Sequence, residues 1–361
     1  MSIKTHFQNI SEPRVLGRTK HKLIDIIGIT IIALIAECDE WQDIVDWARS
    51  KEKHLREYFE LPNGIPSHDT FERVFSIINP TEFERCFIAW VKSIFGNDNR
   101  YIHVDGKSIK GSRDESKGKK MLHIVHAWSS SNSVLLGQFK TDEKSNEITA
   151  IPELLKMLDI KGCVITIDAM GCQHQIAEQI VEQGADYILA VKDNQKELSE
   201  QIQTAFEHQA IQSKNETIEK DHGRIETRTC KAITNLELID ATQKWKDCKS
   251  IVEVTRIREI KNVATKEKSY YISSLATDAS DMNLGIRKHW SVENELHWTL
   301  DVTFKEDKSR KRKENEGQNF SLCRKIALNV VKSYDGDKRS IKRRRKMSSY
   351  DFEYLKNLVK I

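Results

Sequence analysis

The chain has 361 residues, a formal net charge of +4, 31% charged residues and 39% hydrophobic residues. This length and balance are typical of a soluble globular protein that folds into two or three compact units. Its seven cysteines are scattered without a C-x-x-C pair. That pattern argues against a disulfide framework or a cysteine-rich zinc site and indicates reduced thiols in a cytoplasmic protein.

The first part of the chain, residues 1–95, is predicted to be an α-helical N-terminal domain. The apolar run Leu23–Cys38 contains Asp25 and is too short to span a membrane. We interpret it as a buried helix that continues into DEWQDIVDWA, and we expect no membrane contact. A second amphipathic helix is expected between Ser67 and Pro80. The pattern fits a plain helical bundle and half of a helix-turn-helix DNA reader equally well.

From Tyr101 the pattern changes to strands. Three strand-like runs come first: YIHVDG, LHIVHAWSS and SVLLGQFKT. They are followed by the helix EITAIPELLKMLD, the strand VITIDAMG, the helix CQHQIAEQIVEQG and the strand DYILAVK. This is the element order of a ribonuclease H-like α/β mixed sheet, in which the first strand lies beside the fourth. Asp105 ends the first and Asp168 the fourth, so the two carboxylates are expected as neighbours at one sheet edge.

The remaining boundaries follow from changes in composition. Residues 100–194 are predicted to form the first part of the catalytic core. Residues 195–283 are predicted to be a β-rich insertion with one polar helix and three antiparallel strands. Residues 284–334 return to a helical pattern and would complete the core with a third acid. Residues 335–361 are predicted to be a basic C-terminal tail, charged enough for Asp335–Met347 to be mobile.

Two neighbouring aspartates repel each other, and both ionise at low free-energy cost only when a cation lies between them. All-oxygen ligands select Mg²⁺, with Mn²⁺ as a substitute, and two such ions about 3.5–4 Å apart support in-line phosphoryl transfer. The third carboxylate is expected after the insertion, where His289, Glu293 and His297 share one helix face. Glu293 is the predicted third ligand. Weaker candidates are Glu295, Asp301 and Asp307.

Three other interpretations are weaker. The tripeptide GKS at Gly106–Ser108 lacks the first glycine of a P-loop, because position 101 is Tyr101. The histidine–glutamate–histidine ladder does not have the H-E-x-x-H spacing of a zinc site, and no G-x-S-x-G elbow marks a serine hydrolase. Trp290 and Trp298 are expected in the hydrophobic core rather than as base-stacking residues.

Four motifs resemble one known family: VDGKSIKGS, ITIDAMGCQ, DHGRIETR and HWSVENELHWTLDVTFKEDKSR. They are similar to the bacterial insertion-sequence DDE transposases of the H-repeat-associated group, and the similarity runs nearly end to end. The resemblance implies Mg²⁺-dependent DNA strand cleavage and strand transfer at transposon ends. It also implies that Asp105, Asp168 and Glu293 are the catalytic and metal-binding acids.

One departure from related transposases concerns the motif Y-x-x-R-x-x-x-E-x-x-x-x-x-x-K. Aligned on its glutamate, this chain has Ile286, His289 and Leu300 at the other three places. His289, helped by Arg287 or Lys288, would replace the arginine, whereas the lysine has no assigned counterpart.

The expected partner is double-stranded DNA, as transposon ends and as target, bound by a homodimer or larger assembly associated with the nucleoid. The N-terminal domain is expected to recognise the ends. The predicted DNA-binding residues are Lys107, Lys110, Arg113, Arg287, Lys288, His289 and His297. The alternatives are a domesticated or inactive transposase that only binds DNA, and a metal-dependent DNA nuclease without strand transfer.

Overall fold

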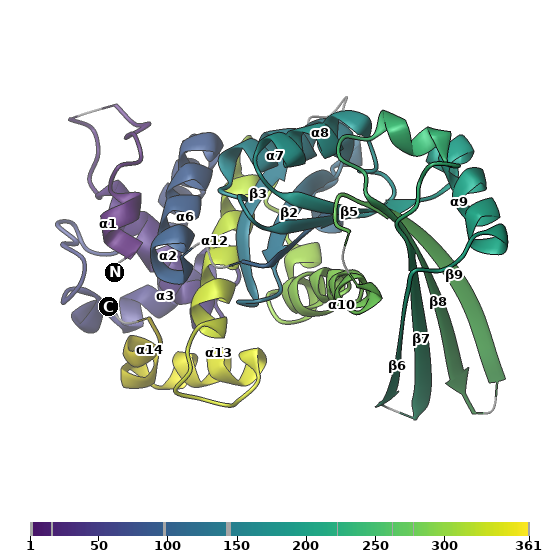
Figure 1. Cartoon of the computed structure of the whole chain (residues 1–361). Helices are drawn as coiled ribbons and strands as arrows, with labels where there is room; N and C mark the ends of the chain where they lie inside the picture. The colour runs from purple at the N-terminus through teal and green to yellow at the C-terminus, as the bar shows by residue number, and fades with distance from the viewer. Residues whose placement is uncertain are drawn as a thin grey trace.

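In the part of the chain that the structure describes, nine strands form a mixed sheet in the order β3-β2-β1-β4-β5-β9-β8-β7-β6 (Figure 1). The computed structural model describes residues 3–15, 17–96, 99–141, 146–221, 223–261, 263–276 and 278–359. The strands are β1 Tyr101–Ile109, β2 Leu122–Ser129, β3 Val134–Lys140, β4 Val164–Ile167, β5 Asp186–Val191, β6 Ser213–Asp221, β7 Arg224–Ile233, β8 Ser250–Ile260 and β9 Val263–Ser273. β1 is antiparallel to β2 and parallel to β4, and β4 is parallel to β5. The predicted ribonuclease H-like arrangement is confirmed.

The strand register brings the two predicted aspartates side by side. Val104 of β1 pairs with Ile167 of β4, so Asp105 and Asp168 follow at the same level. β4 ends there, but β1 continues to Ile109 because β2 still offers it backbone partners. Asp105 therefore lies within its strand, whereas the sequence analysis placed it at the end of the strand. The pairing of β1 with β4 ends just before the two aspartates.

The insertion continues the sheet of the core. It contains four antiparallel strands, where three were predicted, because the polar sequence SKNETIEKD forms β6 at the sheet edge. β9 pairs with β5, with Leu189 opposite Ile272, and so joins the insertion to the core through backbone hydrogen bonds. The polar helix that precedes these strands is α9, Lys196–His208.

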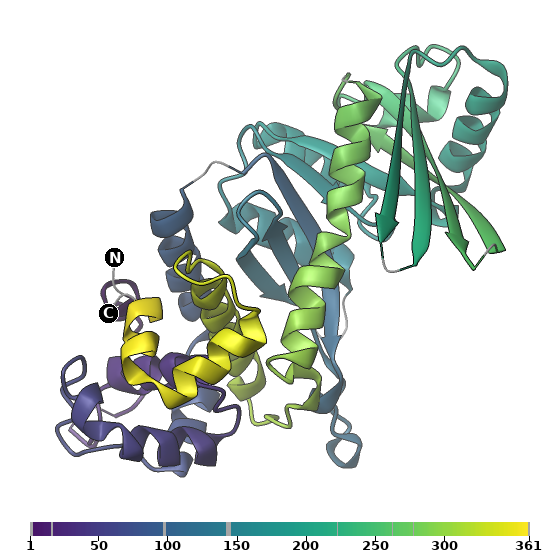
Figure 2. The same cartoon turned by 90° about the horizontal axis from the view of Figure 1, so that it is seen from below.

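Helices cover both faces of the sheet. On one face lie α7, Glu147–Met157, and α8, His174–Glu182 (Figure 1). On the other, α10, Ala279–His289, packs against β1 and β4 of the core and against β6 and β7 of the insertion. Its chain continues through the π-helical segment Val292–His297 into α11, Trp298–Val302. Figure 2 shows this long light green helix running from the insertion toward the helical end of the molecule.

The N-terminal helices pack around a helix from the far end of the chain, α12, Glu316–Lys332. They are α1 Ile3–Phe7, α2 Leu23–Ile35, α3 Trp41–Ser50, α4 Glu52–Leu55, α5 His68–Ile77 and α6 Pro80–Phe95. α2 is almost wholly buried, as predicted, but it does not continue into α3. The helix is interrupted near Glu37, whose backbone is in the left-handed region with a φ of 65°. Within the described residues, no helix is both long and apolar enough to cross a membrane.

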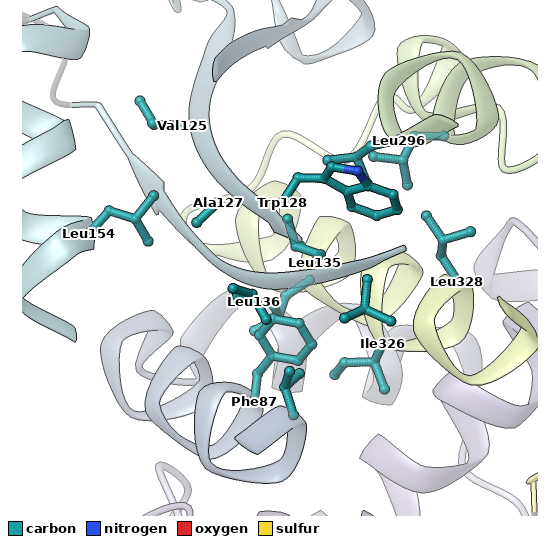
Figure 3. Close-up of a cluster of buried hydrophobic side chains, with 14 of the residues drawn as sticks. Phe87, Val125, Ala127, Trp128, Leu135, Leu136, Leu154, Leu296, Ile326 and Leu328 are labelled. Carbon is teal, nitrogen blue, oxygen red and sulfur yellow. The ribbon is translucent and has the colours of Figure 1, made fainter. Parts of the chain in front are cut away.

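The main hydrophobic core joins these helices to the sheet (Figure 3). Trp128 of β2 and Leu135 of β3 are fully buried, and Phe87 of α6 and Ile326 of α12 close the cluster from the helical side. Each such side chain stabilises the fold by about 1.5–3 kcal/mol relative to an exposed one. The helical region is therefore held against β3 by apolar packing.

The C-terminal segment is folded, including part of Asp335–Met347, the stretch that the sequence predicted to be mobile. It forms α13, Ile341–Tyr350, and α14, Phe352–Val359. Arg345 is 1% exposed, donates to Leu34 O and Thr303 O, and pairs with Asp39 at 2.8 Å. A guanidinium with five donors satisfies several carbonyl groups at once, which explains how a run of basic residues contains a buried one.

Candidate active site

A cavity of about 500 Å³ opens where β1 and β4 diverge, between α10 and the insertion strands. The three acids predicted from the sequence, Asp105, Asp168 and Glu293, all line it. They come from β1, from the turn after β4 and from the π-helical segment. The fold thus brings together three carboxylates that are distant in the sequence.

Backbone N–H groups hold the two aspartates. Gly106 N–H donates to Oδ1 of Asp105 at 2.9 Å. Met170 and Gly171 N–H groups donate to Oδ1 of Asp168 at 3.1 and 3.3 Å. Such turns, in which an aspartate accepts from the backbone beyond it, are a common local structure. They leave the second oxygen of each carboxylate for another partner.

Glu293 reaches the cavity from a π-helical segment. A π-helix holds an extra residue per turn and changes the direction of side chains relative to a regular α-helix, often at functional sites. The weaker candidates lie elsewhere: Glu295 pairs with Lys332 at 3.0 Å, and Asp301 and Asp307 pair with Lys107.

Burial and repulsion between carboxylates both disfavour ionised aspartates in the site, and burial is the larger effect. Burial, followed by the charges of Glu147, Asp168 and Glu293, raises the pKa of the Asp105 carboxyl to about 7. Burial and the charge of Glu147 also raise the pKa of Asp168, although the N–H groups of Gly171 and Met170 oppose the shift. The cavity therefore favours a cation among these oxygens.

The donor set suits a hard divalent cation, because carboxylate oxygens are the ligands of Mg²⁺ and Mn²⁺. The imidazole of His297 lies 3.7 Å from Asp105. It does not carry a positive charge that would offset the carboxylates, because burial lowers its pKa to about 3. As the side chains stand, however, no three His, Cys, Asp or Glu residues of the described part of the chain are grouped closely enough to hold a metal ion.

The two predicted DNA-contacting histidines differ in position. His289 lines the cavity, and its Nδ1 shares a hydrogen bond of 2.7 Å with the hydroxyl of Thr166. Burial lowers its pKa to about 4, so its imidazole is neutral at pH 7. His297 lies 3.1 Å from His126 and is not among the residues that line the cavity. This position does not suit the predicted phosphate contact.

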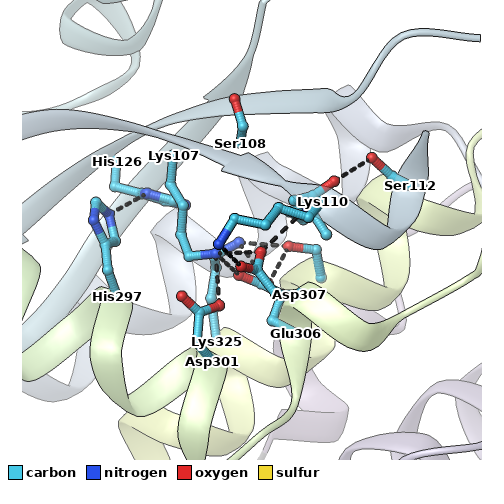
Figure 4. A network of polar contacts seen from close by, with 12 residues as sticks. Lys107, Ser108, Lys110, Ser112, His126, His297, Asp301, Glu306, Asp307 and Lys325 are labelled. Atoms are coloured by element: carbon cyan, nitrogen blue, oxygen red, sulfur yellow. Dashed lines mark hydrogen bonds and ion pairs between the residues drawn. The ribbon is translucent and has the colours of Figure 1, made fainter.

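Lys107 is likewise not placed to bind DNA (Figure 4). It is 8% exposed, and its Nζ lies 2.7 Å from Asp301, 3.2 Å from Asp307 and 3.7 Å from Glu306. Burial opposes its charge, but these carboxylates outweigh burial and raise its pKa. The prediction of Lys107 as a phosphate contact is wrong, because its ammonium is enclosed by these acids.

None of the other predicted basic contacts is among the residues that line the cavity. Lys110 and Arg113 are exposed after β1, each with an ion-pair partner. Arg287 pairs with Glu219 of β6 at 2.9 Å, and Lys288 lies 5.9 Å from the ring centre of Tyr101.

The insertion supplies cavity residues that the sequence analysis missed. Arg228 of β7 and Arg256 of β8 line the cavity with Lys192, which follows β5. Arg256 lies over the ring of Trp290 at 5.3 Å. Trp290 and Trp298 are 38% and 58% exposed, so their predicted place in the core is wrong. A signal for Arg228 existed, since it ends the motif DHGRIETR.

Comparison with known proteins agrees with this geometry. Residues 92–330 match the family model described as Transposase DDE domain, and residues 4–91 match the one described as DDE_Tnp_1-associated. The H repeat-associated putative transposase YhhI of Escherichia coli K12 is 40% identical over 98% of this chain and 96% of its own length. The putative transposase YncI of E. coli O157:H7 is 40% identical over 99% of this chain and 94% of its own.

Among solved structures, a piggyBac transposase synaptic complex with hairpin DNA matches with a TM-score of 0.43 and 13% identity, over 99% of this chain and 76% of that one. The assignment rests on the sequence matches, which span almost the whole chain. The chain belongs to the DDE transposase family, in the H repeat-associated group.

Proposed function

We propose that this chain is an active transposase that cuts DNA at the ends of its insertion sequence and joins those ends to target DNA. The observation that carries the proposal is the meeting of Asp105, Asp168 and Glu293 in one cavity. Membership of the DDE family supports it. Burial and neighbouring carboxylates raise the pKa values of Asp105 and Asp168, so keeping these two together costs folding free energy that a relic has no need to accept.

Asp105, Asp168 and Glu293 would hold Mg²⁺, or Mn²⁺ in its place. When bound, two such ions activate the attacking hydroxyl and stabilise the charge on the leaving oxygen. The N–H groups of Gly106, Met170 and Gly171 keep the two aspartates oriented toward that site.

The DNA strand would be held by the basic residues around the cavity. Arg228 and Arg256 face the acids from the insertion, and Glu226 and Glu267 hold their guanidinium groups in place. His289 would donate a neutral hydrogen bond to a phosphate oxygen. Phosphate contacts position DNA without reading sequence, so recognition of the ends is assigned to the N-terminal helices.

Each transposition event joins two DNA ends, so the working assembly contains at least a homodimer of the chain with double-stranded DNA. Lys110 and Arg113, both exposed, would extend the DNA surface. Binding that rests on such contacts weakens steeply with salt.

The test is Mg²⁺-dependent cleavage of a duplex that carries the element's own ends, taken from the flanks of its gene. Wild type is compared with Asp168→Asn and Glu293→Gln, and Glu295→Gln is the matched control. Glu295 lies on the same π-helical segment as Glu293, but pairs with Lys332.

We expect cleavage at the ends by wild type and by Glu295→Gln, and none by the other two variants. DNA binding without cleavage in either Mg²⁺ or Mn²⁺ would favour a DNA-binding relic instead. Cleavage without joining of the ends to target DNA would favour a nuclease.

A further inference from the structure

We propose that Ser130, His103 and Thr166 form a hydrogen-bonded chain that presents the Nε2–H group of His289 to a phosphate oxygen of the DNA. The inference rests on the proposed function and names positioning residues for it, because these three groups act through His289. His103 lies on β1, Thr166 on β4, and His289 is the last residue of α10. The sequence analysis singled out none of the three positioning residues.

The chain runs beside the two aspartates of the cavity. His103 pairs with Thr166 in the parallel register of β1 and β4. His103 and Asp105 share one face of β1, because side chains two residues apart point the same way from a strand. Thr166 lies two residues before Asp168, is 3% exposed and lines the cavity together with both aspartates. A buried polar pair therefore lies next to the acids.

Three hydrogen bonds make the chain continuous. The hydroxyl of Ser130 lies 2.8 Å from Nε2 of His103, and Nδ1 of His103 lies 2.6 Å from the hydroxyl of Thr166. The same hydroxyl lies 2.7 Å from Nδ1 of His289. None of these distances exceeds that of a normal hydrogen bond, so the groups orient one another. Nε2 is the nitrogen of His289 that remains for a ligand in the cavity.

The number of protons in the chain restricts how its members can point. A neutral imidazole has one N–H group, and a hydroxyl has one O–H group. Burial lowers the pKa of His103 to about 2 and that of His289 to about 4, so both imidazoles are neutral at pH 7. Each inner member therefore donates to one neighbour and accepts from the other, and all of them point in the same direction.

Acceptor groups favour one of the two directions, because acids line the cavity and DNA would bring phosphate oxygens. In that direction the hydroxyl of Ser130 donates to His103, which donates to Thr166. Thr166 in turn donates to Nδ1 of His289, so the imidazole proton of His289 is on Nε2. The reverse direction would turn a lone pair of Nε2 toward oxygens that are themselves acceptors. Buried groups thus hold a neutral donor ready for DNA.

The first experiment measures Mg²⁺-dependent cleavage of the element's ends by full-length variants. Thr166→Val removes the hydroxyl with little change of shape, and Thr166→Ser keeps it. Thr166→Val is tested in the wild-type background and in His289→Phe, as a double-mutant cycle. Thr242→Val is the matched control, because Thr242 is also buried and donates to Ile239 O at 2.7 Å, but does not line the cavity.

We expect His289→Phe and Thr166→Val each to slow cleavage by about 10- to 100-fold, the effect of losing a hydrogen bond to a charged group. Thr166→Ser and Thr242→Val should cleave like wild type. Thr166→Val should add nothing to His289→Phe, since Thr166 acts through His289. Equal losses in the two backgrounds, or wild-type cleavage by Thr166→Val, would overturn the inference.

The second experiment determines the tautomer of His289 by NMR of the ¹⁵N-histidine-labelled chain, without DNA. The two ring nitrogens have different shifts in the two tautomers, and His289→Phe identifies the signals. We expect the Nε2–H form in wild type and in Thr166→Ser, and a mixture with the Nδ1–H form in Thr166→Val. An Nδ1–H form in wild type would overturn the inference and leave the proposed function intact. If wild type does not cleave, the proposed function fails, and the tautomer still decides this inference.

Discussion

Replacing Lys107 by methionine tests the enclosed ion-pair network most directly. The ammonium of Lys107 lies within 4 Å of Asp301, Asp307 and Glu306, and Glu306 is fully buried. Methionine keeps much of the side-chain volume but leaves these carboxylates without their shared cation. Lys325, at 3.4 Å, then remains with Glu306.

Removing one partner of a buried ion pair typically destabilises a protein by about 3–5 kcal/mol, out of a total stability of about 5–15 kcal/mol. We therefore expect Lys107→Met to lower the urea midpoint strongly at pH 7, with an unchanged slope. Tryptophan fluorescence reports the transition. Lys110→Met is the matched control, because Lys110 pairs with Asp307 from an exposed position and should leave the midpoint nearly unchanged.

The same two variants distinguish an ion-pair role from a DNA-binding role. If Lys107 contacted DNA, Lys107→Met would keep wild-type stability and reduce the salt dependence of DNA affinity by about one unit of slope. That result would refute the placement of Lys107 among the acids. We expect the change in salt dependence from Lys110→Met instead.

Three further predictions concern stability. In metal-free buffer, Asp105→Asn should be more stable than wild type at pH 7 but not at pH 4: the folded pKa of Asp105, about 7, exceeds the unfolded value of about 3.9, so ionisation removes stability as pH rises through this window. A pH-independent difference between their urea midpoints would contradict this. Arg345→Ala should lose about 3 kcal/mol or more by urea unfolding, whereas Arg343→Ala, at an exposed position of the same helix, should not; equal losses would show that Arg345 is not the anchor. Gly111→Ala should lose about 1–3 kcal/mol in the same assay, because its Cβ would lie 2.5 Å from the backbone oxygen of Ser309, and a wild-type midpoint would show that this turn can move.

The sheet order and the three acids could be predicted because their signals are local. Strand-like runs separated by turns give the element order, and the order alone places the first strand beside the fourth. Asp105 and Asp168 then become neighbours without any knowledge of side-chain packing. Strand β6 was missed because its residues are mostly polar and it lies at the sheet edge, where burial does not impose an apolar pattern.

Contacts between distant parts of the chain could not be predicted in this way. Lys107 lies in a run of charged residues that is typical of a surface, but its partner Asp307 is 200 residues away. Arg345 pairs with Asp39, 306 residues away.

The pairing of β5 with β9 limits which mutations can inactivate copies of this gene and still leave a folded protein. If a deletion removed residues 196–274, β5 would become an open sheet edge with the apolar sequence DYILAV. Unpaired strands of this kind associate with one another and aggregate. A deletion across the insertion would therefore leave an insoluble product. Copies that lose activity but persist as folded proteins are expected to carry point substitutions at the acids, with the whole sheet preserved.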